Sequence, residues 1–183
     1  FEVNFFGSVS VTRALLPLLK QTKNSRIIGI SSLAGLLSGP GFSAYAASKH
    51  ACEGFYKSLR QELYPWNIHV SVVNPGFMST PMIDASVKGS KSMLLNAPND
   101  IKECYPISIL EEQEEGVRIL CENPLKVCNN IIKAISDKNP HFHYFVGMQA
   151  AVLRYIVMLP VTLLMKISYF LSKPPSPHQE ALN

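Results

Sequence analysis

The chain has 183 residues, of which 47% are hydrophobic and 16% charged, and its formal net charge is +4. This length suits one domain with a buried core, and so apolar a composition excludes an intrinsically disordered protein. The 17 Lys and Arg residues are scattered and do not alternate with aromatic residues, which argues against nucleic-acid binding and leaves attraction to an anionic membrane surface open.

The first expected element is a helix over residues 1–20, followed by a polar turn over 21–25. Asn4 is the polar residue near its start that could face a site, and the alternative is a helix-end Asn that bonds backbone groups. Residues 26–31 form a short apolar run without alternation, as expected of a central parallel strand covered on both faces. The broad apolar face of the helix consists of Val3, Phe6, Val9, Leu15, Leu16 and Leu19.

The stretch 27–49 reads as a buried strand, a glycine-rich loop and the start of a helix, and three of its side chains can share one task. Ser32 follows the strand, Tyr45 begins the helix, and Lys49 lies one turn further along the same helical face. An ammonium group favours a phenolate and lowers the pKa of a tyrosine from its ordinary value of about 10. A serine hydroxyl can hold a reacting oxygen. The three residues indicate proton transfer during hydride chemistry on a carbonyl or an alcohol.

The helix that carries Tyr45 is expected over 44–64, with Ser43 as N-cap and Pro65 as its stop. Its first turns contain small residues that would allow close packing on the sheet. We expect His50 and Glu53 to be solvated, without a catalytic role. The later apolar positions are expected in the core or in a helix-to-helix dimer contact, and they are Phe55, Leu59 and Leu63.

A second strand over 68–74 runs into Pro75 and Gly76, and open α/β sheets bind ligands at this end of their strands. Thr80 is expected to cap the next helix or to contact a ligand. Residues 81–121 are less regular, and their acidic run is expected on a solvated helix face. The apolar residues of this region suggest an apolar substrate, with ordinary packing as the alternative: Met78, Met82, Ile83, Met93, Leu94 and Leu95.

A further helix is expected to begin at Asn123 and Pro124 and to reach about residue 138, before a last strand over 143–146. One face of this helix is lined by Val127, Ile131, Ile132 and Ile135. The cysteines, at positions 52, 104, 121 and 128, have no ligand spacing, so they are read as small apolar residues of a reducing compartment and no metal site is predicted.

The stretch 148–172 is strongly apolar and is expected to form a helix. Its uncharged run, residues 155–165, is shorter than the roughly 20 residues that span a bilayer, and Pro160 interrupts it. A helix lying in the membrane interface fits best, and a buried or dimer-interface helix is the alternative. Residues 173–183 form a Pro-rich tail that is expected to be disordered.

Four motifs resemble the short-chain dehydrogenase/reductase family. Ile-Ser-Ser-Leu-Ala-Gly at 30–35 and Tyr-Ala-Ala-Ser-Lys at 45–49 resemble its catalytic segment. Val-Asn-Phe-Phe-Gly at 3–7 resembles the helix with its active-site asparagine, and Asn-Pro-Gly-Phe-Met-Ser-Thr at 74–80 resembles its Pro-Gly-x-x-x-Thr segment. The motifs follow the family's order within residues 1–80.

This resemblance implies a role for each candidate catalytic residue. Tyr45 would be the general acid/base and Lys49 would hold the ribose hydroxyls of the cofactor and lower the Tyr45 pKa. Ser32 would orient the substrate oxygen, and Asn4 would hold a water that relays protons to Lys49. The substrate would be an alcohol or a carbonyl, and the cofactor would supply the redox chemistry.

The resemblance also implies NAD or NADP as cofactor, with these contacts to it: Tyr45, Lys49, Pro75, Gly76 and Thr80. The family's Thr-Gly-x-x-x-Gly-x-Gly phosphate loop and the residue that selects NAD or NADP do not occur in this sequence, and no secretory signal is visible. We therefore expect the carboxy-terminal part of such a protein, as a fragment, an incomplete gene model or a short isoform.

The carboxy-terminal half resembles the branch of the family that contains retinol, 17β-hydroxysteroid and 3-hydroxybutyrate dehydrogenases. It implies an apolar substrate such as a retinoid, a steroid or another lipid, a homodimer, and a membrane-associated location at the endoplasmic reticulum rather than the mitochondrion, with the cytosol as the alternative. The alternative function is a truncated, non-catalytic isoform that acts only through dimerisation or membrane association.

The expected fold class is α/β, as the carboxy-terminal portion of a doubly wound, Rossmann-type parallel sheet with a carboxy-terminal apolar helix. Residues 1–147 would form the catalytic part, in which 81–121 cover the substrate. Residues 148–172 would form the membrane-associated helix and 173–183 the tail.

Overall fold

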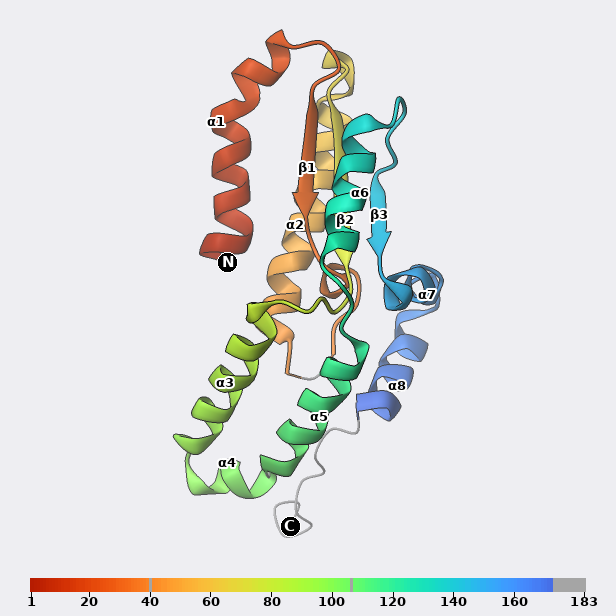
Figure 1. Ribbon diagram of the computed structural model, residues 1–183. Helices are drawn as coiled ribbons and strands as arrows, with labels where there is room; N and C mark the ends of the chain where they lie inside the picture. Colours follow the sequence, from red (N-terminus) through yellow and green to blue (C-terminus); the bar gives the residue numbers. More distant parts are fainter. Residues whose placement is uncertain (40, 106, 173–183) are drawn as a thin grey trace.

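The computed structural model describes residues 1–39, 41–105 and 107–172, and within them three strands form one parallel sheet (Figure 1). The strands are β1 (Arg26–Ile30), β2 (His69–Pro75) and β3 (His143–Val146), and β2 lies in the middle. Helices follow each strand, so the predicted α/β class with parallel strands is confirmed.

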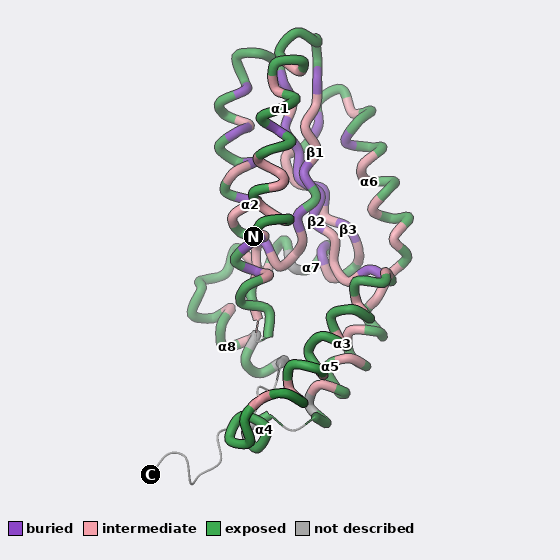
Figure 2. The backbone as a smooth tube through the Cα atoms, turned by 90° about the vertical axis from the view of Figure 1, so that its left-hand side faces the viewer, coloured by how far each residue is buried: buried purple, intermediate pink, exposed green. Residues whose placement is uncertain are grey.

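The two faces of the sheet carry different helices. On one face, Val70 and Val72 of β2 join a core that receives side chains from α1 (Ser8–Gln21) and α2 (Ser43–Glu62). On the other face, Val73 packs with residues of α6 (Leu125–Ser136). Burial is concentrated on the strands and on the inner sides of these helices (Figure 2). The helices and the sheet therefore form three layers, and the carboxyl ends of the strands position the site.

The predicted amino-terminal helix is confirmed, but its first part is wider than an α-helix. Residues Glu2–Gly7 form a π-helical segment, η1, that continues directly into α1. Within η1 the backbone carbonyl of Asn4 accepts hydrogen bonds from the Ser8 hydroxyl at 2.9 Å and from the Cys52 thiol at 3.1 Å. The bond from Cys52 attaches the start of the chain to α2.

Helix α2 crosses the sheet closely because Gly29 of β1 has no side chain. A Cβ atom at Gly29 would lie 2.3 Å from the ring of the buried Tyr56. Ser43 is the first residue of the helix rather than its N-cap, since Phe42 occupies the cap position and makes no side-chain cap bond. The predicted core positions Leu59 and Leu63 are buried.

Residues 81–121 were expected to be less regular, and this is wrong. They form α3 (Pro81–Leu95), α4 (Asn99–Cys104) and α5 (Ile107–Leu120), which extend beyond the carboxyl end of the sheet (Figure 1). Ion pairs connect α3 to α5, as between Lys91 and Glu114 at 3.2 Å and between Arg118 and Asp84 at 2.7 Å. The helices are supported by partners distant in sequence, which local periodicity does not show.

Helix α6 buries less than its pattern indicates. Val127 and Ile131 pack on the core, whereas Ile132 and Ile135 are 61% and 54% exposed. Pro124 occupies the cap position rather than the first helical position, so the predicted cap at Asn123 is wrong, although the Asn123 side-chain oxygen accepts the N–H of Leu125, the first residue of the helix, at 2.9 Å. Of the four residues that line the predicted apolar face, Val127 and Ile131 therefore contact the core.

The apolar carboxy-terminal stretch is two helices rather than one. Helix α7 (Met148–Ile156) ends before a turn, and α8 (Val161–Ser172) begins directly after Pro160, which lacks the N–H that a continuous helix would need. No helix among the described residues is long and apolar enough to cross a bilayer. The predicted tail, 173–183, lies outside the described residues.

Candidate active site

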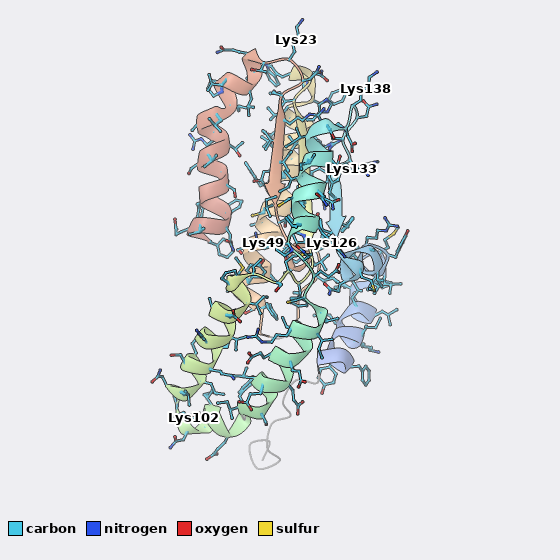
Figure 3. All side chains as sticks on the ribbon, in the orientation of Figure 1. Lys23, Lys49, Lys102, Lys126, Lys133 and Lys138 are labelled. Carbon is cyan, nitrogen blue, oxygen red and sulfur yellow. The ribbon has the colours of Figure 1, made fainter. Side chains whose placement is uncertain are left out.

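The site lies where the strands end and α2 begins. Parallel strands present their carboxyl ends at the same edge of a sheet, so the segments after β1 and β2 meet there. The segment after β1 contains Ser32, and the segment after β2 contains Gly76 and Thr80. Figure 3 shows Lys49 of α2 at this end of the sheet. Hydrogen bonds join Asn4 to α2 through Ser48, Lys49 to the end of β1 through Ile30, and the Ser32 backbone to β2 through Asn74.

Ser32 is held in place by both its side chain and its backbone. Its Oγ accepts the Ala34 N–H at 3.2 Å and caps a short 3-10 turn, η2 (Leu33–Gly35), while its carbonyl accepts a hydrogen bond from Asn74 Nδ2 at 3.3 Å. No acceptor for the hydroxyl proton occurs among the described residues. The half-exposed Ser32 hydroxyl can therefore donate to an oxygen atom of a ligand.

Tyr45 and Lys49 lie on one side of the first turns of α2. The ammonium group of Lys49 is 5.8 Å from the centre of the Tyr45 ring, and its Nζ donates a hydrogen bond to the Ile30 carbonyl at 3.1 Å. Burial lowers the pKa of Lys49, and the charges of Cys52 and Glu53 act in the opposite direction. A cation held beside a phenol at a strand end is an arrangement that can move a proton to or from a bound oxygen.

Asn4 reaches α2 through its side chain. Its Nδ2 donates to Ser48 Oγ at 3.0 Å, and that hydroxyl donates to the Tyr45 carbonyl at 2.7 Å. The partner of Asn4, Ser48, is the residue before Lys49 in α2. The side-chain amide and the backbone carbonyl of Asn4 are therefore both bonded to that helix. The structure therefore places Asn4 against α2, with its side-chain amide hydrogen-bonded to Ser48.

The Pro75–Gly76 turn is closely packed. The Gly76 N–H donates to the Val146 carbonyl at 3.0 Å, and a Cβ at Gly76 would lie 2.3 Å from the side-chain oxygen of Gln149. That Gln149 oxygen also accepts the Phe77 N–H at 3.0 Å. The backbone of this turn is therefore fixed by α7 from behind.

Thr80 occupies the N-cap position of α3 but makes no side-chain cap bond. Of its two expected roles, capping by the hydroxyl is wrong and ligand contact is still a prediction. Thr80 lines a cavity of about 340 Å³ together with Ser79, Pro81, Ile83, Asp84, Arg118 and Cys121. Its hydroxyl can therefore serve a ligand in this cavity.

A group that the sequence did not indicate lies directly behind these residues. Glu53 was expected to be solvated, and this is wrong: it is 3% exposed and accepts hydrogen bonds from Asn74 Nδ2 at 2.6 Å and His143 Nε2 at 2.9 Å. Burial by itself raises the pKa of the Glu53 carboxyl, but the bonds from His143 and Asn74 outweigh it and the pKa is lowered. The signal available in the sequence was its position four residues after Lys49, on the same face of α2.

Within the described residues, no group of three or more His, Cys, Asp or Glu side chains is placed to hold a metal ion. Cys52, Cys121 and Cys128 are free thiols, of which only Cys52 is buried. The chemistry that the described side chains offer at this site is proton transfer, hydrogen bonding and positive charge.

Comparisons with known proteins agree with this arrangement. Residues 1–91 match the family model described as short chain dehydrogenase. Dehydrogenase/reductase SDR family member 7B of Xenopus laevis is 43% identical over 91 residues, which are 50% of this chain and 28% of that protein. Estradiol 17-beta-dehydrogenase 2 of Mus musculus is 37% identical over 155 residues, which are 81% of this chain and 40% of that protein.

Among solved structures, a short-chain dehydrogenase from Streptomyces avermitilis superposes with a TM-score of 0.66 at 26% sequence identity, covering 94% of this chain and 60% of that one. The likeness thus extends over nearly the whole chain. The chain spans 28% and 40% of the lengths of the two curated relatives named above.

Proposed function

The chain belongs to the short-chain dehydrogenase/reductase family, and we propose that it supplies the proton-transfer half of an NAD- or NADP-dependent oxidoreductase. The reaction is the interconversion of an alcohol and a carbonyl by hydride transfer. The observation that carries this proposal is the Lys49 ammonium beside the Tyr45 ring, next to a Ser32 hydroxyl whose proton is available to a ligand.

In the direction of carbonyl reduction, the Tyr45 hydroxyl donates its proton to the substrate oxygen as that oxygen gains negative charge. The Ser32 hydroxyl donates a hydrogen bond to the same oxygen and holds it in position. The positive charge of Lys49 stabilises the phenolate that Tyr45 leaves behind. In the oxidation direction each proton moves the opposite way, with Tyr45 as the base.

The residues at the strand ends fit one end of a nicotinamide cofactor. The Gly76 backbone is packed against Gln149, which fixes the turn after β2, and Thr80 has a hydroxyl without a cap bond. Tyr45, Lys49, Pro75, Gly76 and Thr80 would hold that end. When bound, the cofactor gives up or accepts the hydride.

An apolar substrate is part of the proposal. A cavity of about 430 Å³ lies between the end of α5 and the start of α7, and most of its lining is apolar: Ile119, Leu120, Cys121, Glu122, Met148, Gln149 and Val152. The mouse relative is named for estradiol, which is an apolar secondary alcohol. A retinoid, a steroid or another lipid alcohol is the substrate class that this cavity favours.

We also propose that the protein associates with a membrane surface, at the endoplasmic reticulum, and forms a homodimer. Helices α7 and α8 expose many apolar side chains, and Arg154 and Lys166 beside them could reach lipid phosphates. The exposed apolar residues are Met148, Val152, Tyr155, Met158, Val161, Met165, Tyr169 and Phe170. Co-sedimentation with anionic vesicles tests the membrane association, and sedimentation velocity tests the homodimer. A protein that stays in the supernatant when vesicles are present would contradict the first, and a monomer would contradict the second.

The function is tested with the longest natural polypeptide that contains this chain. NADH and NADPH are titrated by fluorescence, and turnover is measured with steroid, retinoid and short hydroxy-acid alcohols. We expect binding of at least one cofactor and turnover with the apolar alcohols. A polypeptide that carries the phosphate loop but binds neither cofactor would contradict the proposal and favour a role in dimerisation or membrane association alone.

A further inference from the structure

We propose that Glu53 is a positioning residue of this site, because its buried carboxylate ties the helix that carries Tyr45 and Lys49 to the segments after β1 and β2. The inference rests on the proposed function. It assigns a role to a group that touches none of the reacting atoms and that acts through the residues it holds.

The geometry of Glu53 connects three strands. Its carboxylate accepts Asn74 Nδ2 of β2 at 2.6 Å and His143 Nε2 of β3 at 2.9 Å. The same Asn74 amide donates to the Ser32 carbonyl at 3.3 Å, beyond the end of β1. One carboxylate therefore links α2, through a single amide, to the backbone of the residue that is to hold the substrate oxygen.

Asn74 also precedes Pro75 and Gly76, which are to face the cofactor. Its side chain is fully buried, so a shift of the carboxylate cannot be compensated by water at this amide. A movement of Glu53 would therefore be transmitted both to Ser32 and to the Pro75–Gly76 turn. Errors of about 1 Å in such positions can reduce turnover by about a hundredfold.

Gly35 shows how little space this junction leaves. A Cβ atom there would lie 2.6 Å from Ser31 Oγ, 3.0 Å from Glu53 Cγ and 3.0 Å from the Lys49 carbonyl. The loop after β1 thus rests directly on the turn of α2 between Lys49 and Glu53. The Glu53 carboxylate, Lys49 and this loop form one packed unit.

The charge of Glu53 has a second effect on the site. It lies one helical turn from Lys49 and favours the protonated amine, whereas burial favours the neutral one. The groups with charge or titratable protons around Glu53 are Lys49 and Cys52 on α2 and His143 on β3. Removing the carboxylate should loosen the position of Lys49 and increase the fraction of its amine that is unprotonated.

The test uses Glu53→Gln, which removes the carboxylate charge, and His143→Phe, which removes the hydrogen bond to Glu53 and keeps an aromatic ring beside Phe142 and Phe145. Two further variants are the controls. Glu62→Gln removes an exposed carboxylate from the same helix, and Tyr144→Phe removes a hydrogen bond to Asp137 on the opposite face of the sheet. The first readout is the acylation rate of the Lys49 amine relative to the exposed Lys57, measured by mass spectrometry on the folded chain without substrate or cofactor. The second is kcat and KM in the longest natural polypeptide.

We expect the Lys49-to-Lys57 ratio to rise at least about threefold in Glu53→Gln, because the lost carboxylate no longer favours the protonated amine of Lys49. We expect a rise in His143→Phe as well, because this variant removes one of the hydrogen bonds that hold the Glu53 carboxylate although the carboxylate keeps its charge. In both variants kcat should fall by about tenfold to a hundredfold, and KM should change less. Both controls should keep the parent ratio and the parent kcat.

An unchanged ratio and unchanged kcat in Glu53→Gln would overturn the positioning role. If Glu53→Gln does not fold, His143→Phe decides alone, and parent values in that variant overturn the proposal. If the parent polypeptide shows no cofactor-dependent turnover, the proposed function fails, and the labelling ratio still measures whether Glu53 positions Lys49.

Discussion

The Lys49 ammonium lies 5.8 Å from the centre of the Tyr45 ring, and Lys49 is anchored to the end of β1 through the Ile30 carbonyl. The pair is therefore placed by the sheet as well as by the helix that carries it. In the proposed function, the substrate oxygen binds to the hydroxyl groups of Tyr45 and Ser32.

Replacing Lys49 with Met removes the positive charge and keeps a long apolar side chain. We expect turnover of the complete enzyme to fall by about a hundredfold or more, because the Tyr45 phenolate loses its neighbouring cation. The free energy of unfolding should be unchanged or higher, since burial disfavours the charged amine. Steady-state kinetics and urea denaturation measure the two effects. Lys57→Met on the exposed side of α2 is the control, and an equal loss of turnover there would contradict the expectation.

Asn4 is expected to contribute to stability through its bond to Ser48. Asn4→Ala removes the donor at 3.0 Å and should lower the free energy of unfolding by about 1 kcal/mol. Asn130→Ala removes a half-exposed Asn whose side chain bonds its own helix, and should cost less than about 0.5 kcal/mol. Chemical denaturation of both variants provides the comparison. Equal losses would show that the Asn4–Ser48 bond adds nothing.

Gly29 and Gly54 form a matched pair of glycine substitutions. Gly29→Ala places a methyl group 2.3 Å from the Tyr56 ring and should destabilise the fold by about 1–3 kcal/mol. Gly54→Ala lies in α2 with nothing within 4 Å, and should stabilise it by about 0.5–1 kcal/mol through helix propensity. Thermal denaturation should therefore shift in opposite directions. Shifts of the same sign would contradict the close approach of α2 to β1.

The Glu53 carboxyl should make the fold sensitive to acid. Its pKa is lowered in the folded chain, so the unfolded chain binds more protons in the window between the folded value and the ordinary value of about 4.3. The stability that Glu53 contributes is complete above that ordinary value and is lost as the pH falls through the folded value. Denaturation between pH 3 and 6 should show a steeper loss in the parent than in Glu53→Gln. Parallel curves would contradict this.

The sequence predicted the parts of the site that depend on spacing along one element. Tyr45 and Lys49 share a helical face because they are four residues apart, and Ser32 ends a strand that is recognisable by its apolar run. Glu53 was missed because its burial depends on which strands lie against α2. Asn74 and His143, its partners, come from two different strands, and no local pattern connects them.

Two other differences also have identifiable physical causes. Helices α3 and α5 are joined by ion pairs between residues such as Asp84 and Arg118, 34 positions apart, which sequence periodicity does not show. Pro160 was recognised as an interruption of the apolar stretch, yet its effect was underestimated. It separates α7 from α8 completely, so the apolar residues lie on two short helices.

The central claim is that Tyr45 transfers the proton of a hydride-transfer reaction, and Tyr45→Phe tests it most directly. The variant is compared with Tyr64→Phe, which alters an 83% exposed tyrosine, in the longest natural polypeptide that contains this chain. We expect Tyr45→Phe to lose turnover by about a hundredfold to ten-thousandfold. It should keep the parent's cofactor affinity and thermal stability, and Tyr64→Phe should keep the parent's turnover. Turnover by Tyr45→Phe close to that of the parent would contradict the account.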